Sequence, residues 1–356
     1  MSALNSENKK QYRVVQWATG NVGSRAMRRV IEHPSLELVG VKVHSDKKVG
    51  QDAGELAGVE PIGVAATNSM DDVLALKPDC VLYMPHVCDY DEVCQLLTAG
   101  INVVTTRMEF QNPAALDPAL AERIEAACQQ GNSSIHASGS SPGFISEALP
   151  IVLASIQRRL DHLNINEFAD CSSRNSPEML FDMMGFGHEP RSVGEAQQAH
   201  MKNSFGPSLQ LVATALGMPI EHFEVDAEVG LARKDVHIAA GVVPAGTVAA
   251  TKTTITGMHK GKPLISFTAT WFISSDVETS DGKEWKFVSP SGWHVVMQGD
   301  CPLDVMITFP VALEDYADMT PGLTAHRPVN AIAYVCDAPA GIRTTVDLPQ
   351  IVAQLA

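Results

Sequence analysis

The sequence contains no apolar run that approaches the roughly 20 residues needed to cross a lipid bilayer. Its start, MSALNSENKKQYR, is polar and lacks the apolar stretch of a secretory signal, so we expect a cytoplasmic protein. Basic residues are also scarce, because 26 Lys and Arg stand against 41 Asp and Glu, for a formal net charge of −15. Such a charge repels phosphate backbones and anionic lipids, so neither nucleic acid nor a membrane is an expected partner.

Cysteine pairs at metal-binding or redox spacing are absent too. The seven cysteines include no Cys-x-x-Cys pair, and the twelve histidines are scattered without the spacing of metal ligands. We therefore expect no metal site, no disulfide framework and a reducing compartment. The chain has 356 residues, 45% of them hydrophobic and 19% charged, which is typical of a folded protein of about two domains.

The first half of the chain alternates short apolar strands with amphipathic helices. Such strands are expected at 13–18, 36–44, 80–83, 102–105 and 134–137. The alternation predicts an α/β fold with parallel strands and right-handed crossovers, which is the doubly wound sheet of a Rossmann domain. We assign this dinucleotide-binding domain to residues 1–145 and expect its ligand at the carboxyl ends of the strands.

The second half reads differently, with longer alternating strands after a helical stretch at 177–216. These strands are expected at 161–169, 224–232, 247–258, 263–275, 293–298 and 304–309. Turns at 259–262 and 280–282 favour hairpins, so we predict an α+β substrate and dimerisation domain with a largely antiparallel sheet at 146–322. Residues 323–356 are expected to form a C-terminal helical segment that packs back on the first domain.

The loop after the first strand reads Ala18-Thr-Gly-Asn-Val-Gly-Ser-Arg-Ala26, a G-x-x-G-x-x-A pattern. In a full dinucleotide fingerprint, glycine would also stand at Ala18. Its glycines let backbone N–H groups approach a pyrophosphate at the start of the next helix. The cofactor-binding residues expected in this loop are Thr19, Gly20, Asn21, Val22 and Gly23.

The segment that follows the second strand is expected to select the cofactor. An acid at this position holds a ribose 2′-hydroxyl, whereas His44, Ser45, Lys47 and Lys48 suit a 2′-phosphate. NADP is therefore favoured, although Asp46 leaves NAD open and the two lysines also fit a solvated loop. Two further pairs of expected cofactor contacts are Pro85 with His86, beside the ribose, and Gly139 with Ser140, in the turn beneath the nicotinamide.

Several segments resemble the dihydrodipicolinate-reductase-like family, and more closely its branch of 2,4-diaminopentanoate dehydrogenases and native amine dehydrogenases. The segments that carry this resemblance are 14–58, 102–110 (NVVTTRMEF), 138–144 (SGSSPGF), 171–187 (CSSRNSPEMLFDMMGFG) and 324–349. The resemblance implies an NAD(P)-dependent amine dehydrogenase that is a homodimer. The paired-His stretch and the D-A-P-S-G-T segment of true dihydrodipicolinate reductases are missing, so their reaction is an alternative.

Glu109 is the candidate catalytic residue. It follows the strand at 102–105, at an edge where doubly wound sheets place their chemistry. Amination of a carbonyl needs a base that removes a proton from ammonium and an anion near the iminium, and one carboxylate serves both needs. The resemblance implies the same role, whereas an ordinary loop glutamate paired with Arg107 is the alternative.

The substrate pocket is expected to be small and apolar, because little else selects an uncharged ketone or aldehyde. Its candidate residues are Phe144, Phe168, Cys171, Asn175 and Met179. The predicted partners are a small carbonyl or amine substrate and ammonia. Reduction of a preformed C=N or C=C bond, or sensing of NADP(H) without turnover, are the other functions that the sequence leaves open.

Overall fold

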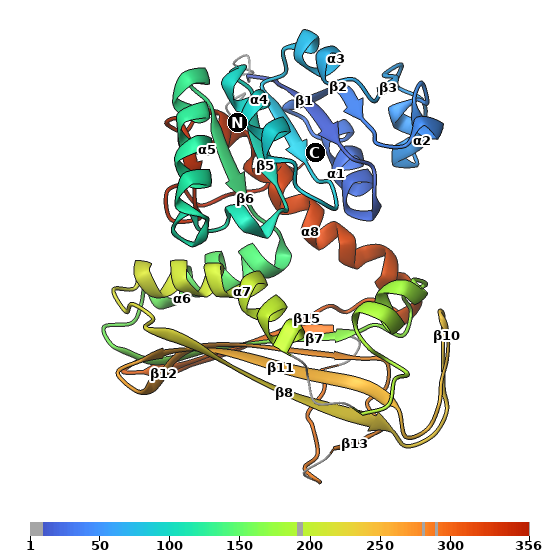
Figure 1. Ribbon diagram of the computed structural model, residues 1–356, viewed down its shortest axis with the longest axis vertical. Helices are drawn as coiled ribbons and strands as arrows, with labels where there is room; N and C mark the ends of the chain where they lie inside the picture. The colour runs from blue at the N-terminus through green and yellow to red at the C-terminus, as the bar shows by residue number, and fades with distance from the viewer. Residues whose placement is uncertain (1–9, 191–194, 280–281, 289–290, 356) are drawn as a thin grey trace, which may run out of the picture. The chain divides into compact units, whose positions relative to one another are not determined.

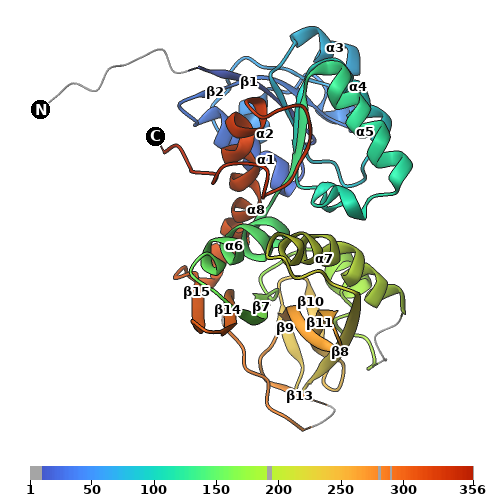
Figure 2. The same ribbon diagram turned by 90° about the vertical axis from the view of Figure 1, so that its left-hand side faces the viewer.

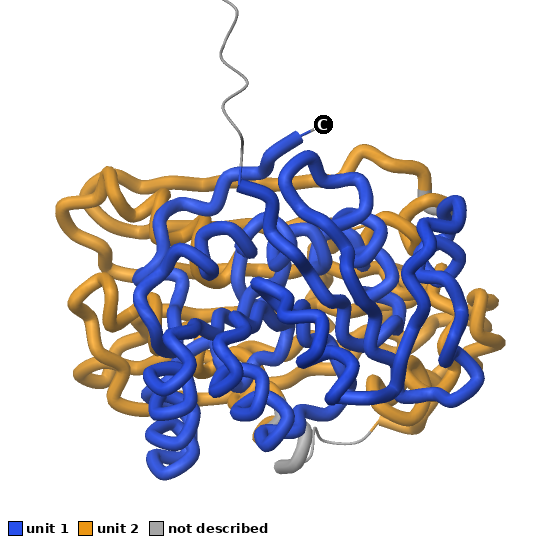
Figure 3. Tube along the Cα trace, turned by 90° about the horizontal axis from the view of Figure 1, so that it is seen from above, with its two compact units in different colours: residues 1–144, 321–356 blue, residues 145–320 orange. Residues whose placement is uncertain are grey.

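The computed structural model describes residues 10–190, 195–279, 282–288 and 291–355. The chain divides into unit 1, residues 1–144 and 321–356, and unit 2, residues 145–320, which Figure 3 shows in blue and orange. Among the described residues, no helix is long and apolar enough to cross a membrane.

Unit 1 contains a seven-stranded sheet in which all neighbouring strands are parallel. Its order is β16-β6-β5-β4-β1-β2-β3. The strands are β1 (Tyr12–Trp17), β2 (Leu36–Lys42), β3 (Ala66–Thr67), β4 (Cys80–Tyr83), β5 (Asn102–Thr105), β6 (Ser134–Ala137) and β16 (Gly341–Arg343). The predicted Rossmann sheet is confirmed, and chain order reverses between β1 and β4, which is the topological switch point.

Helices cover both faces of this sheet (Figure 1). They are α1 (Asn21–Ile31), α2 (Ala53–Ala57), α3 (Met70–Leu76), α4 (Tyr90–Thr98), α5 (Pro118–Gly131) and α8 (Leu313–Cys336), of which residues 321–336 belong to unit 1. The 3-10 turns are η1 (Asp46–Lys48), η2 (Met108–Phe110) and η3 (Pro113–Ala115). Side chains of β1 alternate between two cores. Val14 packs with α1 and α8, whereas Val15 and Trp17 pack with α3, α4 and α5.

Helices α5 and α8 end in different ways. Helix α5 includes Gly131, and Asn132 takes the left-handed conformation (φ 50°) that ends it. A Cβ on Gly131 would lie 1.9 Å from the Leu97 carbonyl oxygen, so this glycine permits close packing on α4. Helix α8 ends at Cys336, and the segment that was expected to continue as helix instead forms β16, with no helix in residues 337–355.

His136 on β6 should make the stability of unit 1 depend on pH. The ring is fully buried, its Nδ1 donates to the Arg343 carbonyl oxygen at 2.7 Å, and burial lowers the pKa of His136 to about 4. The pKa of His136 in the unfolded chain is about 6.5, so below that pH the unfolded chain binds a proton on His136 that the folded chain does not bind. Stability should therefore fall by about 3 kcal/mol as the pH drops from 6.5 to 4.

His136→Asn, which keeps a donor for the Arg343 carbonyl, should flatten this dependence. Urea unfolding of both proteins at pH 4 to 8 measures the difference. Parallel curves for the two proteins would show that His136 is not the responsible group.

Unit 2 is built on a second seven-stranded sheet, of order β13-β8-β11-β12-β7-β14-β15. The strands are β7 (Leu160–Asp170), β8 (His222–Ala232), β11 (Val248–His259), β12 (Lys262–Phe272), β13 (Val277–Thr279), β14 (Ser291–Gly299) and β15 (Leu303–Thr308), and β9 (Val236–Ile238) pairs with β10 (Gly241–Val243) apart from them. The predicted largely antiparallel sheet is confirmed, and only the β12–β7 pair in it is parallel.

Helical segments pack on one face of this sheet, as Figures 1 and 2 show. They are η4 (Ser140–Ala148), which begins in unit 1 and is not helical at residues 141–143, α6 (Leu149–Ala154), η5 (Glu178–Met183) and α7 (Glu195–Ala215). Phe205 of α7 stacks on Phe267 of β12 with ring centroids 4.1 Å apart. The predicted hairpin turn joins β11 to β12 with Lys260 and Gly261 both left-handed, whereas the turn at 280–282 lies partly outside the described residues.

Candidate active site

The expected cofactor residues and Glu109 together follow five neighbouring strands of the parallel sheet. Residues 19–23 follow β1, residues 44–48 follow β2, Pro85 and His86 follow β4, and Gly139 and Ser140 follow β6. Glu109 follows β5. Since all these strands are parallel, the structure brings these residues to one edge of the sheet of unit 1, on both sides of the switch point.

The start of helix α1 is left open to an anion. Side chains of Ser69, Asp89 and Asp117 cap α3, α4 and α5, whereas Gly20 caps α1 with no side-chain bond and no acid in the first turn. Unpaired N–H groups and the positive end of the helix therefore remain for a phosphate.

Gly20 itself has no structural reason to be glycine. Its φ is −74°, and a Cβ added there would meet nothing within 4 Å. Every other described glycine either takes a left-handed φ or has an atom within 4 Å of its Cβ position. The space beside Gly20 leaves room for a pyrophosphate, so the chemistry of the loop fits a dinucleotide.

The expected cofactor residues in the segment after β2 fall into two groups, one that holds the segment in place and one with exposed side chains. Lys48 Nζ donates to the Thr19 carbonyl oxygen (3.1 Å) and to Thr19 Oγ1 (2.9 Å), so it ties this segment to the glycine loop. Asp46 accepts a bond from Asn68 Nδ2 at 2.9 Å. Ser45 and Lys47 are exposed side chains that remain for a ribose or its phosphate.

Two groups of residues extend this edge. A cavity of about 570 Å³ is lined by His44, residues 87–92 and Arg123. Beyond β6, Arg327 of α8 donates from Nε to Ser138 Oγ (2.9 Å), and its guanidinium lies 5.7 Å from the centroid of the Phe144 ring. Ser140 Oγ bonds Thr324 Oγ1 at 2.7 Å, so α8 fixes the loop that carries Gly139 and Phe144.

Glu109 lies in the short turn η2, and its side chain is 29% exposed. Arg107 Nη2 pairs with Glu109 Oε1, and Arg107 Nη1 donates to the His86 carbonyl oxygen at 2.5 Å. Glu109 Oε2 is buried and has no partner among the described residues. Burial, and next the charge of Glu109, raise the pKa of Cys88 to about 12, so the carboxylate acts on the loop after β4.

Arg107 thus holds one oxygen of Glu109 in place, whereas the other oxygen is buried without a partner among the described residues. This is the ion pair that the sequence offered as the alternative role of Glu109. An unsatisfied buried carboxylate oxygen is costly in a merely structural pair.

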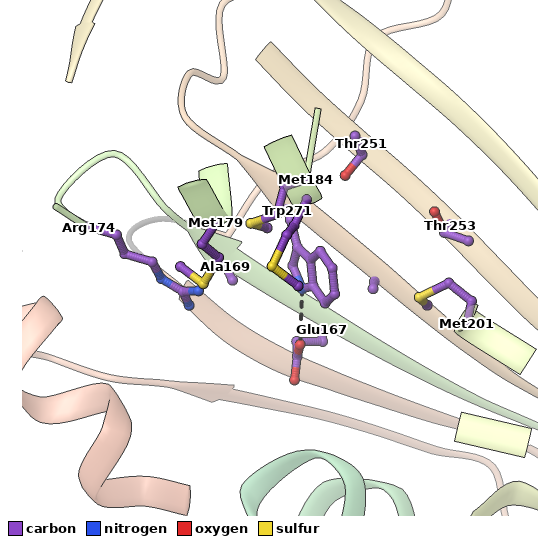
Figure 4. Close-up of a pocket in the computed structure, with 11 residues that line it drawn as sticks. Glu167, Ala169, Arg174, Met179, Met184, Met201, Thr251, Thr253 and Trp271 are labelled. Atoms are coloured by element: carbon purple, nitrogen blue, oxygen red, sulfur yellow. Dashed lines mark hydrogen bonds between the residues drawn. The ribbon is translucent and has the colours of Figure 1, made fainter. Parts of the chain in front are cut away.

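The expected pocket residues of unit 2 do not line one cavity, although Met179 packs against the cluster that contains Cys171. Met179 lines a cavity on the helix-covered face of the sheet (Figure 4), whereas Phe168 lines a smaller cavity beside Trp285, on the other face. Cys171 is fully buried in the core, which raises its thiol pKa to about 11, and Asn175 is exposed. The sequence missed Glu167 and Arg174, which line the Met179 cavity.

No group of three His, Cys, Asp or Glu side chains in the part of the chain that the structure describes could hold a metal ion.

Two family models match this chain. Residues 14–125 match the family model described as "Dihydrodipicolinate reductase, N-terminus". Residues 144–356 match the model described as "2,4-diaminopentanoate dehydrogenase C-terminal domain". The parallel sheet, its uncapped first helix and these matches define an NAD(P)-dependent oxidoreductase. The chain belongs to the second of these families, as the sequence predicts.

Individual relatives agree with this assignment. An amine dehydrogenase of Streptomyces virginiae is 27% identical over 351 residues, which cover 94% of this chain and 95% of that one. A 4-hydroxy-tetrahydrodipicolinate reductase of Synechococcus elongatus is 24% identical over 230 residues, 60% of this chain and 81% of the relative. The solved structure of an amine dehydrogenase from Mycobacterium smegmatis has the same fold, with a TM-score of 0.74, 19% identity and coverage of 96% and 97%.

Proposed function

We propose that this enzyme is an amine dehydrogenase that reductively aminates small ketones or aldehydes with ammonia, and that oxidatively deaminates the amine in reverse. The observation that carries the proposal is the buried, unpartnered Oε2 of Glu109 at the carboxyl edge of the sheet of unit 1. The name of the Streptomyces virginiae relative supports it.

Ammonium has no lone pair, so a base must act before it attacks a carbonyl. Glu109 Oε2 takes a proton from ammonium and returns it to the hydroxyl group that leaves as water. Glu109 is then a carboxylate again when the iminium cation has formed, and its charge stabilises that cation. A bound nicotinamide supplies the hydride that the iminium carbon takes.

The test is a spectrophotometric assay of NADPH with short ketones and aldehydes, with and without ammonium. Loss of NADPH absorbance that depends on ammonium is the expected result. Equal loss without ammonium would point to a carbonyl or alkene reductase, and no loss with any substrate would point to a sensor.

We propose NADP as the preferred cofactor, held by Gly20 and its neighbours and by Ser45 and Lys47. Ser45→Asp should then shift the ratio of NADPH to NADH affinity toward NADH by about tenfold or more, because a carboxylate repels the 2′-phosphate. Fluorescence titration with both cofactors measures the ratio, and Ser45→Ala is the matched uncharged control. An unchanged ratio in Ser45→Asp would place the phosphate elsewhere.

A homodimer formed through the unit 2 sheet is a further proposal that rests on the family resemblance, and a cytoplasmic location is one that rests on the polar start of the sequence and its cysteine usage. Light scattering of the purified chain measures the oligomeric state, and a monomer at micromolar concentration would overturn the dimer.

A further inference from the structure

Ala18 makes the turn between β1 and the start of α1, at the position where the full dinucleotide fingerprint has glycine. Its φ is 71°, in the left-handed region that a residue with a Cβ disfavours. Lys77, Asn132 and Lys260 are the other described residues, apart from glycines, with a positive φ. Those three are exposed, at helix ends or in a hairpin turn, whereas Ala18 is buried. Ala18 therefore keeps an unfavourable backbone conformation inside the fold, next to the expected pyrophosphate site.

Contacts on both sides of Ala18 hold it in this conformation. Its N–H donates to the Lys42 carbonyl oxygen at 2.8 Å. Its carbonyl oxygen accepts a bond from Gln16 Nε2 at 2.9 Å. Helix α1 lies against the same carbonyl, because a Cβ on Gly23 would be 2.2 Å from the Ala18 oxygen. The Ala18 carbonyl is thus enclosed between the amide of Gln16 and the first turn of α1.

Gln16 is fully buried on β1, and its amide is directed at this turn. Nε2 donates to the carbonyl oxygens of both Trp17 (3.2 Å) and Ala18 (2.9 Å). Carbonyl oxygens only accept, so the nitrogen of the amide is the atom that faces them. Oε1 is buried and has no partner among the described residues, which is unfavourable for stability. Stability alone therefore does not explain a glutamine at this position, whereas the two bonds to the turn do.

We propose that Gln16 is a positioning residue for the bound dinucleotide. It holds the Ala18 carbonyl, so that an alanine keeps the left-handed turn that directs the free N–H groups of α1 to the pyrophosphate. A glycine at position 18 would adopt this turn without such support. The inference rests on the binding of a dinucleotide at the start of α1, which is part of the proposed function, and it holds for whichever reaction the cofactor serves.

The test is a double-mutant cycle of Gln16→Met and Ala18→Gly, with cofactor affinity measured by fluorescence titration. Gln16→Met keeps the length of the side chain and removes the amide donor. It should weaken the binding of NADPH and NADH alike by about tenfold, because both cofactors carry the pyrophosphate. Ala18→Gly alone should stay within about threefold of the natural chain, and Gln16→Met should cost at most about threefold in that background.

Gln129→Met is the matched control. The Gln129 amide also donates to a backbone carbonyl, that of Ala340 at 3.1 Å, but it lies on α5. Its loss should leave cofactor affinity unchanged. Equal losses from Gln16→Met in both backgrounds, or a loss in neither, would overturn the inference, because Gln16 would then not act through Ala18.

Thermal unfolding of each variant shows whether it folds. If Gln16→Met alone does not fold, the double variant decides the question. A folded double variant with the cofactor affinity of Ala18→Gly supports the inference, and an unfolded one overturns it. Gly20→Val, which blocks the pyrophosphate directly, separates the two claims. Full affinity in Gly20→Val would overturn the cofactor site itself, whereas weak binding there with full affinity in Gln16→Met would overturn this inference alone.

Discussion

Glu109→Gln is expected to lower ammonium-dependent oxidation of NADPH by about 10²- to 10⁴-fold, the usual worth of a positioned general base. Glutamine keeps the size of the side chain and still accepts a bond from Arg107 through its carbonyl oxygen. It does not take a proton from ammonium, and it places no negative charge beside an iminium cation. The loss should therefore appear in kcat, with little change in the affinity for NADPH.

Glu122→Gln is the matched control for this variant. Glu122 lies on α5, is exposed and has no partner among the described residues, so its loss of charge should leave the rate unchanged. Thermal unfolding of both variants separates a lost base from a disturbed fold. A Glu109→Gln enzyme that keeps most of its rate would instead favour reduction of a preformed C=N bond, which needs no base for ammonium.

The centre of the unit 1 sheet is predictable because its strands β4, β5 and β6 are short apolar runs between helices. The strands β4, β5 and β6 fall at the predicted residues. The last strand, β16, is not predictable in this way. It has three residues, too few to show a period, and it joins the sheet through pairing with β6, which is distant in sequence.

The position of Glu109 at the carboxyl edge of the unit 1 sheet can be predicted from the order of strands and helices along the chain. The lining of the unit 2 cavity cannot be predicted in this way, because it depends on which alternate residues of strand β7 face the helices. A shift by one residue exchanges the two faces of a sheet. Phe168 is the more natural choice for an apolar wall, yet its neighbour Glu167 faces the Met179 cavity. Leu163 and Ile165 give the available signal, since an acid two residues further stands on their buried side.

Gly20→Val should lower the affinity for NADPH and NADH alike by about 100-fold or more, because the side chain fills the space that a pyrophosphate needs and blocks its bonds to backbone N–H groups. The fold should tolerate the change. The backbone of Gly20 is extended (φ −74°, ψ −172°), which a β-branched residue accepts, and its Cβ meets no atom within 4 Å.

Gly58→Val serves as the control, because it is expected to change stability and not cofactor affinity. Gly58 also has free space around its Cβ position, but it ends α2 in a left-handed conformation (φ 73°) that valine resists. This variant should lose about 1–2 kcal/mol of stability and keep its cofactor affinity. Fluorescence titration and thermal unfolding of both variants separate the two effects. Full cofactor affinity in Gly20→Val would mean that the dinucleotide does not lie on the start of α1. The assignment of Glu109 as the catalytic residue would then be wrong as well.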